Sequence, residues 1–195
     1  MNIAFLVNMD RSKDRLKVSE KRILDAGFSG IERFSAYDGS LPENEPKFEQ
    51  KQMSIFNISP SQKGCFLSHL DIWQKIADGI HDYRIVFEDD IIFHSKFQDI
   101  WSIYLEQIIT NKYDFVLLGY TKIPIPDNMK NDLLLNDLSA GCTHSYILSK
   151  NGAKRLLELY EKFKTSRNFN RIKYFMDGCC DSFTQYIMEG KFMKT

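Results

Sequence analysis

The sequence has 195 residues, with 26 Lys or Arg residues balanced by 26 Asp or Glu residues. This length suits one domain with a full hydrophobic core, so we expect a single domain over residues 1–195. The balanced charge gives no overall attraction to nucleic acid or to an anionic membrane surface. An anionic ligand would therefore have to be bound by a local group of charges.

The amino terminus predicts a strand rather than a signal peptide. The apolar run at 3–7 is short, has no basic flank and is followed by Asn8-Met9-Asp10-Arg11. No run approaches the roughly 18 apolar residues of a membrane span, so we expect no transmembrane segment. The four cysteines, Cys65, Cys142, Cys179 and Cys180, show no C-x-x-C pairing. We interpret them as buried thiols of a reducing compartment and expect a cytoplasmic protein, with peripheral attachment to a membrane as a second option.

Short apolar runs then alternate with segments of helical period. In chain order the patterns predict a strand at 3–8, a helix at 12–26, a strand at 31–37, a helix at 65–78, a strand at 83–92, a helix around 97–108, a strand at 114–118, a strand near 144–148 and a helix from 149. This order favours an α/β fold whose central sheet is mostly parallel, with helices on both faces. Residues 40–62 are polar, contain three prolines and show no clear period, so we expect a long irregular excursion there.

The acidic triplet Glu88-Asp89-Asp90 follows the apolar run Ile85-Val86-Phe87. Because side chains alternate along a strand, Glu88 and Asp90 are predicted to point one way and Asp89 the other. Carboxylate oxygens suit Mg²⁺ or Mn²⁺, which also bind phosphate oxygens. In open α/β sheets, ligands lie outside the carboxyl ends of the strands. A ligand site at this strand end is one interpretation, and a solvated strand end is the other.

Four ordered strings carry a resemblance to a known family. They are residues 8–11 with Arg15, residues 64–70 with Trp73, residues 86–90, and residues 144–153. Together they resemble glycosyltransferase family 25, which includes lipooligosaccharide galactosyltransferases and procollagen galactosyltransferase domains. The resemblance runs from Asn2 to about Leu157. It implies a GT-A type nucleotide-diphospho-sugar transferase fold, a UDP-sugar donor (commonly UDP-galactose), Mn²⁺ or Mg²⁺, inversion at the anomeric carbon, and a glycan or protein hydroxylysine acceptor.

The resemblance also implies roles for single residues. Asp90 matches the direct metal ligand, with Glu88 as a second ligand, and Glu88 or Asp89 matches a contact to the ribose or to metal-bound water. The other positions assigned to donor binding are Asn8, Arg11, Arg15, Asp38, Ser68 and His69. The alternatives are a solvated helix face for the arginines, a plain turn for Asp38 and a hydrogen-bonded core histidine for His69.

Inverting transfer needs a base that accepts the proton of the acceptor hydroxyl. Asp177 and Asp181, four residues apart in a segment predicted to be helical, match the family's aspartate, and Asp177 is the first choice. A helix cap is the alternative for Asp177. His144 matches a second family histidine suited to metal ligation or charge stabilisation, with a strand histidine bound to backbone as its alternative.

Three functions stay open on the sequence. The first is a metal-dependent hexosyltransferase. The second is a nucleotide-sugar or glycan binding module without turnover, because many family members continue past the position of Lys194 while this chain stops at Thr195. The third is another metal-dependent phosphate enzyme, although no P-loop string occurs.

Overall fold

The computed structural model describes residues 3–51, 58–119, 143–165 and 183–184. Its centre is a five-stranded sheet in the order β2-β1-β3-β5-β4. The strands are β1 (Ile3–Asn8), β2 (Gly30–Ser35), β3 (Tyr83–Glu88), β4 (Phe115–Leu117) and β5 (Ser145–Ser149). The helices are α1 (Lys13–Asp25), α2 (Glu45–Gln50), α3 (Pro60–Asp78), α4 (Phe97–Asn111) and α5 (Lys150–Thr165), with a 3₁₀ turn, η1, at Pro42–Asn44.

The sheet is mixed: β1, β2, β3 and β4 run in one direction, as a mostly parallel sheet requires, and among the described strands only β5 runs against them. β1 pairs in parallel with β2 and with β3, whereas β5 is antiparallel to both of its neighbours, β3 and β4. A parallel pair needs a long crossover, and α1 and α3 lie between the parallel strands in the sequence. The sequence between β4 and β5 has prolines and no helical period. Antiparallel pairing does not require a crossover helix there.

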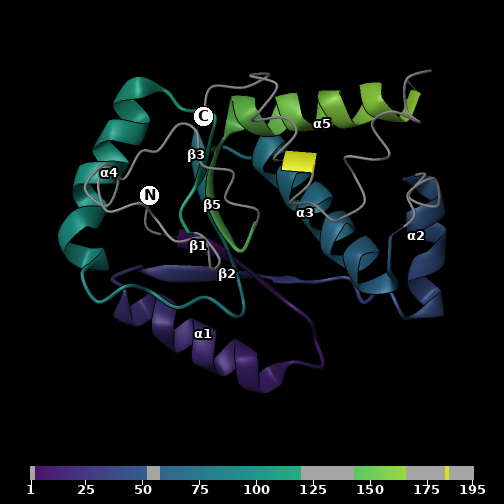
Figure 1. Ribbon diagram of the computed structural model, residues 1–195, viewed down its shortest axis with the longest axis horizontal. Helices are drawn as coiled ribbons and strands as arrows, with labels where there is room; N and C mark the ends of the chain where they lie inside the picture. The colour runs from purple at the N-terminus through teal and green to yellow at the C-terminus, as the bar shows by residue number, and fades with distance from the viewer. Residues whose placement is uncertain (1–2, 52–57, 120–142, 166–182, 185–195) are drawn as a thin grey trace, which may run out of the picture.

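Helices cover both faces of the sheet, as the sequence predicted (Figure 1). Phe5 and Val7 of β1 face one side and belong to the core cluster that contains the apolar residues of α3 and α5. Ala4 and Leu6 face the other side and pack with Ile23 of α1 and with Ile108 of α4. Within the described ranges, none of the helices combines the length and the apolar character that a bilayer crossing requires.

The excursion predicted at 40–62 is more regular than expected. It contains η1 and α2, and α3 begins at Pro60 rather than at Cys65. Ser59 and Gln62 form a capping box, because the Ser59 hydroxyl accepts from the Gln62 amide at 3.3 Å and Gln62 Oε1 accepts from the Ser59 amide at 2.8 Å. Pro60 occupies the first helical position, where a missing N–H costs nothing.

Two glycines let the loop after β2 lie against the start of α3. A Cβ on Gly64 would lie 2.2 Å from the Tyr37 carbonyl oxygen, and a Cβ on Gly39 would lie 1.6 Å from the Pro60 carbonyl oxygen. Backbone therefore packs directly on backbone at this point, and any larger residue would push the loop away. The contact fixes Asp38 beside the carboxyl end of β1.

Candidate functional site

The carboxyl ends of β1, β2, β3 and β4 and the amino end of β5 lie at the same end of the strands, and polar side chains gather there. This end of the strands forms one edge of the sheet. The register pairs Asn8 with Ser35 and Val7 with Glu88, so the carboxyl ends of β1, β2 and β3 are level. β5 runs the other way and pairs Phe87 with Ser145, which brings His144 to the same edge. The residues that the strands present there are Asn8, Asp38, Glu88, Asp89, Gly119 and His144.

Asp89 is held by two partners from the beginning of the chain. The sequence predicted that strand alternation continues through Asp90. The strand instead ends at Glu88, and Asp89 and Asp90 lie in the following turn. Asp89 is buried; its Oδ2 accepts from Asn8 Nδ2 at 2.6 Å, and its Oδ1 lies 3.1 Å from Arg15 Nη1. A buried carboxylate needs such partners, because an unpaired charge there would be costly.

Arg33 of β2 fixes the orientation of Asn8. Its Nε and Nη2 donate to Asn8 Oδ1 at 3.2 and 3.1 Å, and Nη2 also donates to the Asn8 carbonyl at 3.2 Å. The Asn8 amide oxygen thus faces Arg33, and its NH₂ group faces Asp89. Arg33 was not among the residues predicted from the sequence. An arginine at an exposed strand position carries no signal of its own, and only the register reveals its partner.

Arg11 forms an ion pair with Asp38. The other Asp38 oxygen, Oδ1, accepts from the Ser40 amide at 3.0 Å and from the Ser40 hydroxyl at 2.6 Å. These bonds to Ser40, with the attraction of Arg11, hold the pKa of Asp38 below its ordinary value. Asp38 thus closes a turn, as one of its two interpretations from the sequence predicted, and it also faces a cation; its contact with a donor stays a prediction. The side chain of Arg11 is 63% exposed and can reach a ligand at this edge.

A chain of buried hydrogen bonds leads from the core to Glu88. The Trp73 indole N–H donates to the Tyr146 hydroxyl at 3.1 Å, and that hydroxyl lies 2.8 Å from His69 Nδ1. His69 Nε2 lies 3.0 Å from Glu88 Oε1. Because the indole can only donate, the Tyr146 oxygen accepts from it and the Tyr146 proton is available to His69. This direction favours the tautomer whose proton sits on Nε2 and points to Glu88.

The surroundings of the Glu88 carboxyl lower its pKa. Burial raises the pKa of Glu88, whereas the hydrogen bond with His69 and the attraction of that ring lower it. Attraction to His144 and Arg15 lowers it further, so that the pKa of Glu88 lies below its ordinary value of 4.5. The side chain is 28% exposed, while His69 has no exposed surface. Glu88 is therefore an ionised carboxylate that is anchored on one side and open on the other.

Ser68 does not face the edge in this structure. Its hydroxyl accepts from the Tyr37 amide at 2.9 Å and donates to the Gly64 carbonyl at 2.7 Å. Both contacts tie the loop after β2 to α3. The predicted donor contact at Ser68 therefore has no support from the geometry, and the residue acts by positioning Asp38.

Two residues of the acidic triplet at this edge, Asp90 and Glu88, are suited to bind a hard divalent cation, and Asp89 is not. Asp90 is exposed, and among the described residues no hydrogen bond or ion pair engages its carboxylate. Among the described parts of the chain, the side-chain contacts of Glu88 involve Oε1, and its side chain is 28% exposed. Asp89 is already occupied at both oxygens. Oxygen ligands from Asp90 and Glu88 match the donor set of Mn²⁺ or Mg²⁺, with other positions left to water and phosphate.

His144 lies against the end of β4. Its carbonyl accepts from the Glu88 amide at 2.8 Å, and a Cβ on Gly119 would lie 2.6 Å from its Nε2. Gly119 was not predicted as a site residue, although a glycine directly after a strand is a signal of close approach. Asp177 and Asp181, the predicted bases, lie outside the described residues, as does Cys142.

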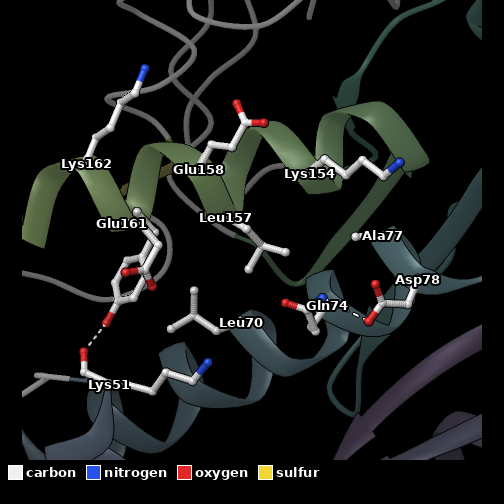
Figure 2. Close-up of a pocket in the computed structure, with 11 residues that line it drawn as sticks. Lys51, Leu70, Gln74, Ala77, Asp78, Lys154, Leu157, Glu158, Glu161 and Lys162 are labelled. Carbon is white, nitrogen blue, oxygen red and sulfur yellow. Dashed lines mark hydrogen bonds between the residues drawn. The ribbon is translucent and has the colours of Figure 1, made fainter.

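A groove of about 560 Å³ lies between α3 and α5, away from these residues (Figure 2). It is walled by Leu70 and Leu157, and charged side chains such as Lys51 and Glu161 surround it. None of its lining residues is a candidate from the sequence. The mixture of charges shows no preference for an anionic donor.

Comparison with known proteins places the chain in a family. The model of "Glycosyltransferase family 25 (LPS biosynthesis protein)" matches residues 1–171. A putative glycosyltransferase, R655, of Acanthamoeba polyphaga mimivirus is 32% identical over 119 residues, which cover 60% of this chain and 36% of the relative. The lipooligosaccharide biosynthesis protein lex-1 of Haemophilus influenzae is 31% identical over 117 residues, covering 52% of this chain and 37% of the relative.

Two animal relatives differ in their described activity. Procollagen galactosyltransferase 1-A of Xenopus laevis is 31% identical over 107 residues, and a probable inactive glycosyltransferase 25 family member 3 of Bos taurus is 30% identical over 105 residues. Each match covers 51% of this chain, but only 17% and 18% of the relatives. The chain thus spans well under half the length of these relatives. The match over residues 1–171 shows that the chain belongs to glycosyltransferase family 25.

Proposed function

We propose that the chain transfers a hexose, with galactose as the first candidate, from a UDP-sugar to a glycan or to protein hydroxylysine. The observation that carries the proposal is the convergence of Asp38, Glu88, Asp89 and two arginines at one edge of the sheet in a member of this family. In open α/β sheets this edge is where nucleotides bind. A GT-A type arrangement is part of the proposal.

Donor binding is assigned to the cationic side of the edge. Arg11 lies in the turn before α1 and Arg15 in the first turn of that helix, each paired with a carboxylate and each at least 49% exposed at the side chain. A diphosphate offers these guanidinium groups bidentate partners. Asp38 is ionised, and its carboxylate is suited to accept hydrogen bonds from the uracil or from the ribose. Asn8, fixed by Arg33, keeps Asp89 in place beneath them.

Asp90 and Glu88 would hold Mn²⁺ or Mg²⁺ at the open side of the edge. When bound, the cation would offset the negative charge that develops on the leaving diphosphate. The protein's part is to keep Glu88 ionised and oriented, which the hydrogen bond from His69 achieves. His144 adds a second imidazole beside Glu88, suited to charge stabilisation.

We assign to Asp177 the role of the base that accepts the proton of the acceptor hydroxyl, with Asp181 as the second choice. In an inverting transfer the acceptor oxygen attacks the anomeric carbon as the bond to the diphosphate breaks, and the base takes the hydroxyl proton. Asp177→Asn should keep donor binding and lower transfer by about a hundredfold or more, and Asp181→Asn is the matched control. Full transfer in both variants would show that the proton leaves by another route.

A binding module without turnover is the second candidate. It is favoured by the description of some relatives as inactive. The deciding experiment incubates the chain with a panel of UDP-sugars and Mn²⁺, with and without glycan and hydroxylysine acceptors, and measures UDP release. Acceptor-dependent release from one donor supports transfer. Saturable donor binding without release supports the module, and no binding of any donor would contradict both. The cytoplasmic location stays a proposal based on the cysteine pattern, and cell fractionation tests it.

A further inference from the structure

A thiol approaches the carboxylate of Glu88 from the same helix that carries His69. Cys65 Sγ lies 4.0 Å from Glu88 Oε1, and His69 Nε2 lies 3.0 Å from the same oxygen. Cys65 and His69 are four residues apart on α3 and thus share one face of that helix. The sulfur, the imidazole nitrogen and the carboxylate oxygen all lie within 4.8 Å of one another.

These separations are close to those of a tetrahedral zinc site. With metal–ligand distances of roughly 2.0–2.3 Å, neighbouring ligand atoms around Zn²⁺ lie roughly 3.3–3.6 Å apart. Glu88 and His69 are slightly closer than this, and Cys65 is slightly farther from Glu88. Binding would require side-chain rotations at Cys65 and Glu88, which are both half-buried. The partly exposed Glu88 also leaves a path from solvent.

We propose that Cys65, His69 and Glu88 form a binding site for a thiophilic divalent cation, with Zn²⁺ as the first candidate. Its donor set of one sulfur, one nitrogen and one oxygen differs from the oxygen set that Asp90 and Glu88 would offer the donor cation, although the two sites share Glu88. Thiolate and imidazole select Zn²⁺ over Mn²⁺, which prefers carboxylate, water and phosphate. With three protein ligands the fourth position stays open to water or another small ligand.

The surroundings of His69 support ligation through Nε2. A ligating histidine usually makes a hydrogen bond through its other ring nitrogen, and His69 Nδ1 already faces the Tyr146 hydroxyl at 2.8 Å. On binding, the thiol proton leaves to solvent, and the imidazole proton moves from Nε2 to Nδ1, where the Tyr146 oxygen accepts it. Trp73 and Tyr146 hold the ring in the required orientation.

Titration of the tag-free 195-residue chain with Co²⁺, in the absence of any nucleotide, tests the site. Co²⁺ takes the same tetrahedral ligands as Zn²⁺ and gives a thiolate-to-cobalt charge-transfer band. We expect one equivalent to bind, to produce this band and to be displaced by Zn²⁺. Cys65→Ser should abolish the band, while the control variant with Cys142, Cys179 and Cys180 all changed to Ser should keep it.

Two further variants keep the test decisive. Glu88→Gln should weaken Co²⁺ binding by about tenfold or more, and Tyr146→Phe should weaken it by about tenfold through His69. Circular dichroism of each variant checks that the fold is kept. The proposal is overturned if the wild-type chain gives no band, if Cys65→Ser keeps it, or if the control variant loses it. Because no donor or turnover enters the measurement, this result is independent of the proposed transferase activity.

Discussion

His69 Nε2 lies 3.0 Å from Glu88 Oε1, although the imidazole has no exposed surface and the carboxylate reaches the open edge of the sheet. A residue fully buried in the core thus sets the orientation of one that faces the ligand side. The structure supports the interpretation of His69 as a hydrogen-bonded core histidine, and its bond with Glu88 links it to the candidate site, while its predicted contact with a donor stays a prediction. The bond also connects the packing between α3 and β5 to the candidate site, through Tyr146.

Tyr146→Phe tests this connection. The change removes the acceptor of the Trp73 indole and the partner of His69 Nδ1, both of them buried. Leaving buried polar groups without partners costs about 1–3 kcal/mol each, so we expect the free energy of unfolding to fall by about 2 kcal/mol or more. Chemical denaturation measures this fall.

A double-mutant cycle with Trp73→Phe separates the hydrogen bond from the loss of packing. We expect the double variant to lose less stability than the sum of the two single variants. If the two losses add to within about 0.3 kcal/mol, Tyr146 and Trp73 do not depend on each other and the chain of hydrogen bonds is not a unit.

Gly64→Ala is expected to destabilise the protein, contrary to the usual preference of helices for alanine. Alanine normally gains about 1 kcal/mol over glycine inside a helix. At this position its Cβ would lie 2.2 Å from the Tyr37 carbonyl oxygen, so the loop that carries Asp38 must move. Overpacking of this kind costs about 1–3 kcal/mol, which thermal unfolding can measure.

Gly30→Ala is the matched control for that change. A Cβ at Gly30 would lie 3.5 Å from the Ile3 side chain, which is an ordinary contact. We expect this variant to unfold within about 0.5 kcal/mol of the original chain. A neutral Gly64→Ala variant would show that the loop after β2 is free to shift, and that the close backbone contact does not position Asp38.

Much of the fold was predictable from apolar periodicity, and the direction of β5 was not. The strand and helix patterns predicted β1, α1 and α4 close to their observed bounds because each has a regular apolar face, and they predicted the start of β3 but placed its end four residues too late. Periodicity carries no information on strand direction, so the pattern near 144–148 predicted a strand without showing that it runs antiparallel to its neighbours. α2 was not predicted because residues 40–62 are polar, contain three prolines and show no clear period; Pro46 lies in the first turn of α2, where proline is tolerated.

The candidate site was predictable where a residue type carries its own chemistry. The acidic triplet and the two arginines were visible as charges, and they do lie at one edge of the sheet. Arg33 and Tyr146 act only through partners that are distant in the sequence, which no single-sequence pattern reveals. Ser68 shows the opposite case, because a polar residue beside a motif histidine proves to bind backbone.

Alkaline pH should expose the contribution of Tyr37. Burial and a hydrogen bond to Asp71 raise the pKa of Tyr37 from 10.0 to about 12. The folded protein therefore keeps the phenol proton more tightly than the unfolded chain, and this stability is full below pH 10 and is lost as pH rises toward 12. The difference in free energy of unfolding between the original chain and Tyr37→Phe should therefore shrink between pH 10 and pH 12. Denaturation at several pH values measures this difference. An advantage that stays constant up to pH 12 would mean that the phenol does not titrate differently in the two states.

The last prediction concerns Arg15, whose side chain is half exposed and lies 3.1 Å from Asp89. If Arg15 binds the diphosphate, its loss removes a hydrogen bond between charged groups, which is worth about 1.5–3 kcal/mol. Arg15→Ala should therefore weaken UDP binding about tenfold or more in calorimetry. The free protein should also lose about 1–3 kcal/mol of stability, because Asp89 is buried and keeps only Asn8 as a partner, so UDP binding is measured at a temperature where the variant is folded.

Lys21→Ala is the matched control for Arg15→Ala. Lys21 lies on the same helix, pairs with Asp25 and is exposed, so its removal changes the net charge equally without touching the edge of the sheet. We expect this variant to bind UDP as the original chain does. Equal weakening in both variants would assign the effect to net charge, a comparison that salt titration would reinforce because exposed charges are screened. If Arg15→Ala binds UDP with unchanged affinity, Arg15 has only a structural role, which is to neutralise Asp89.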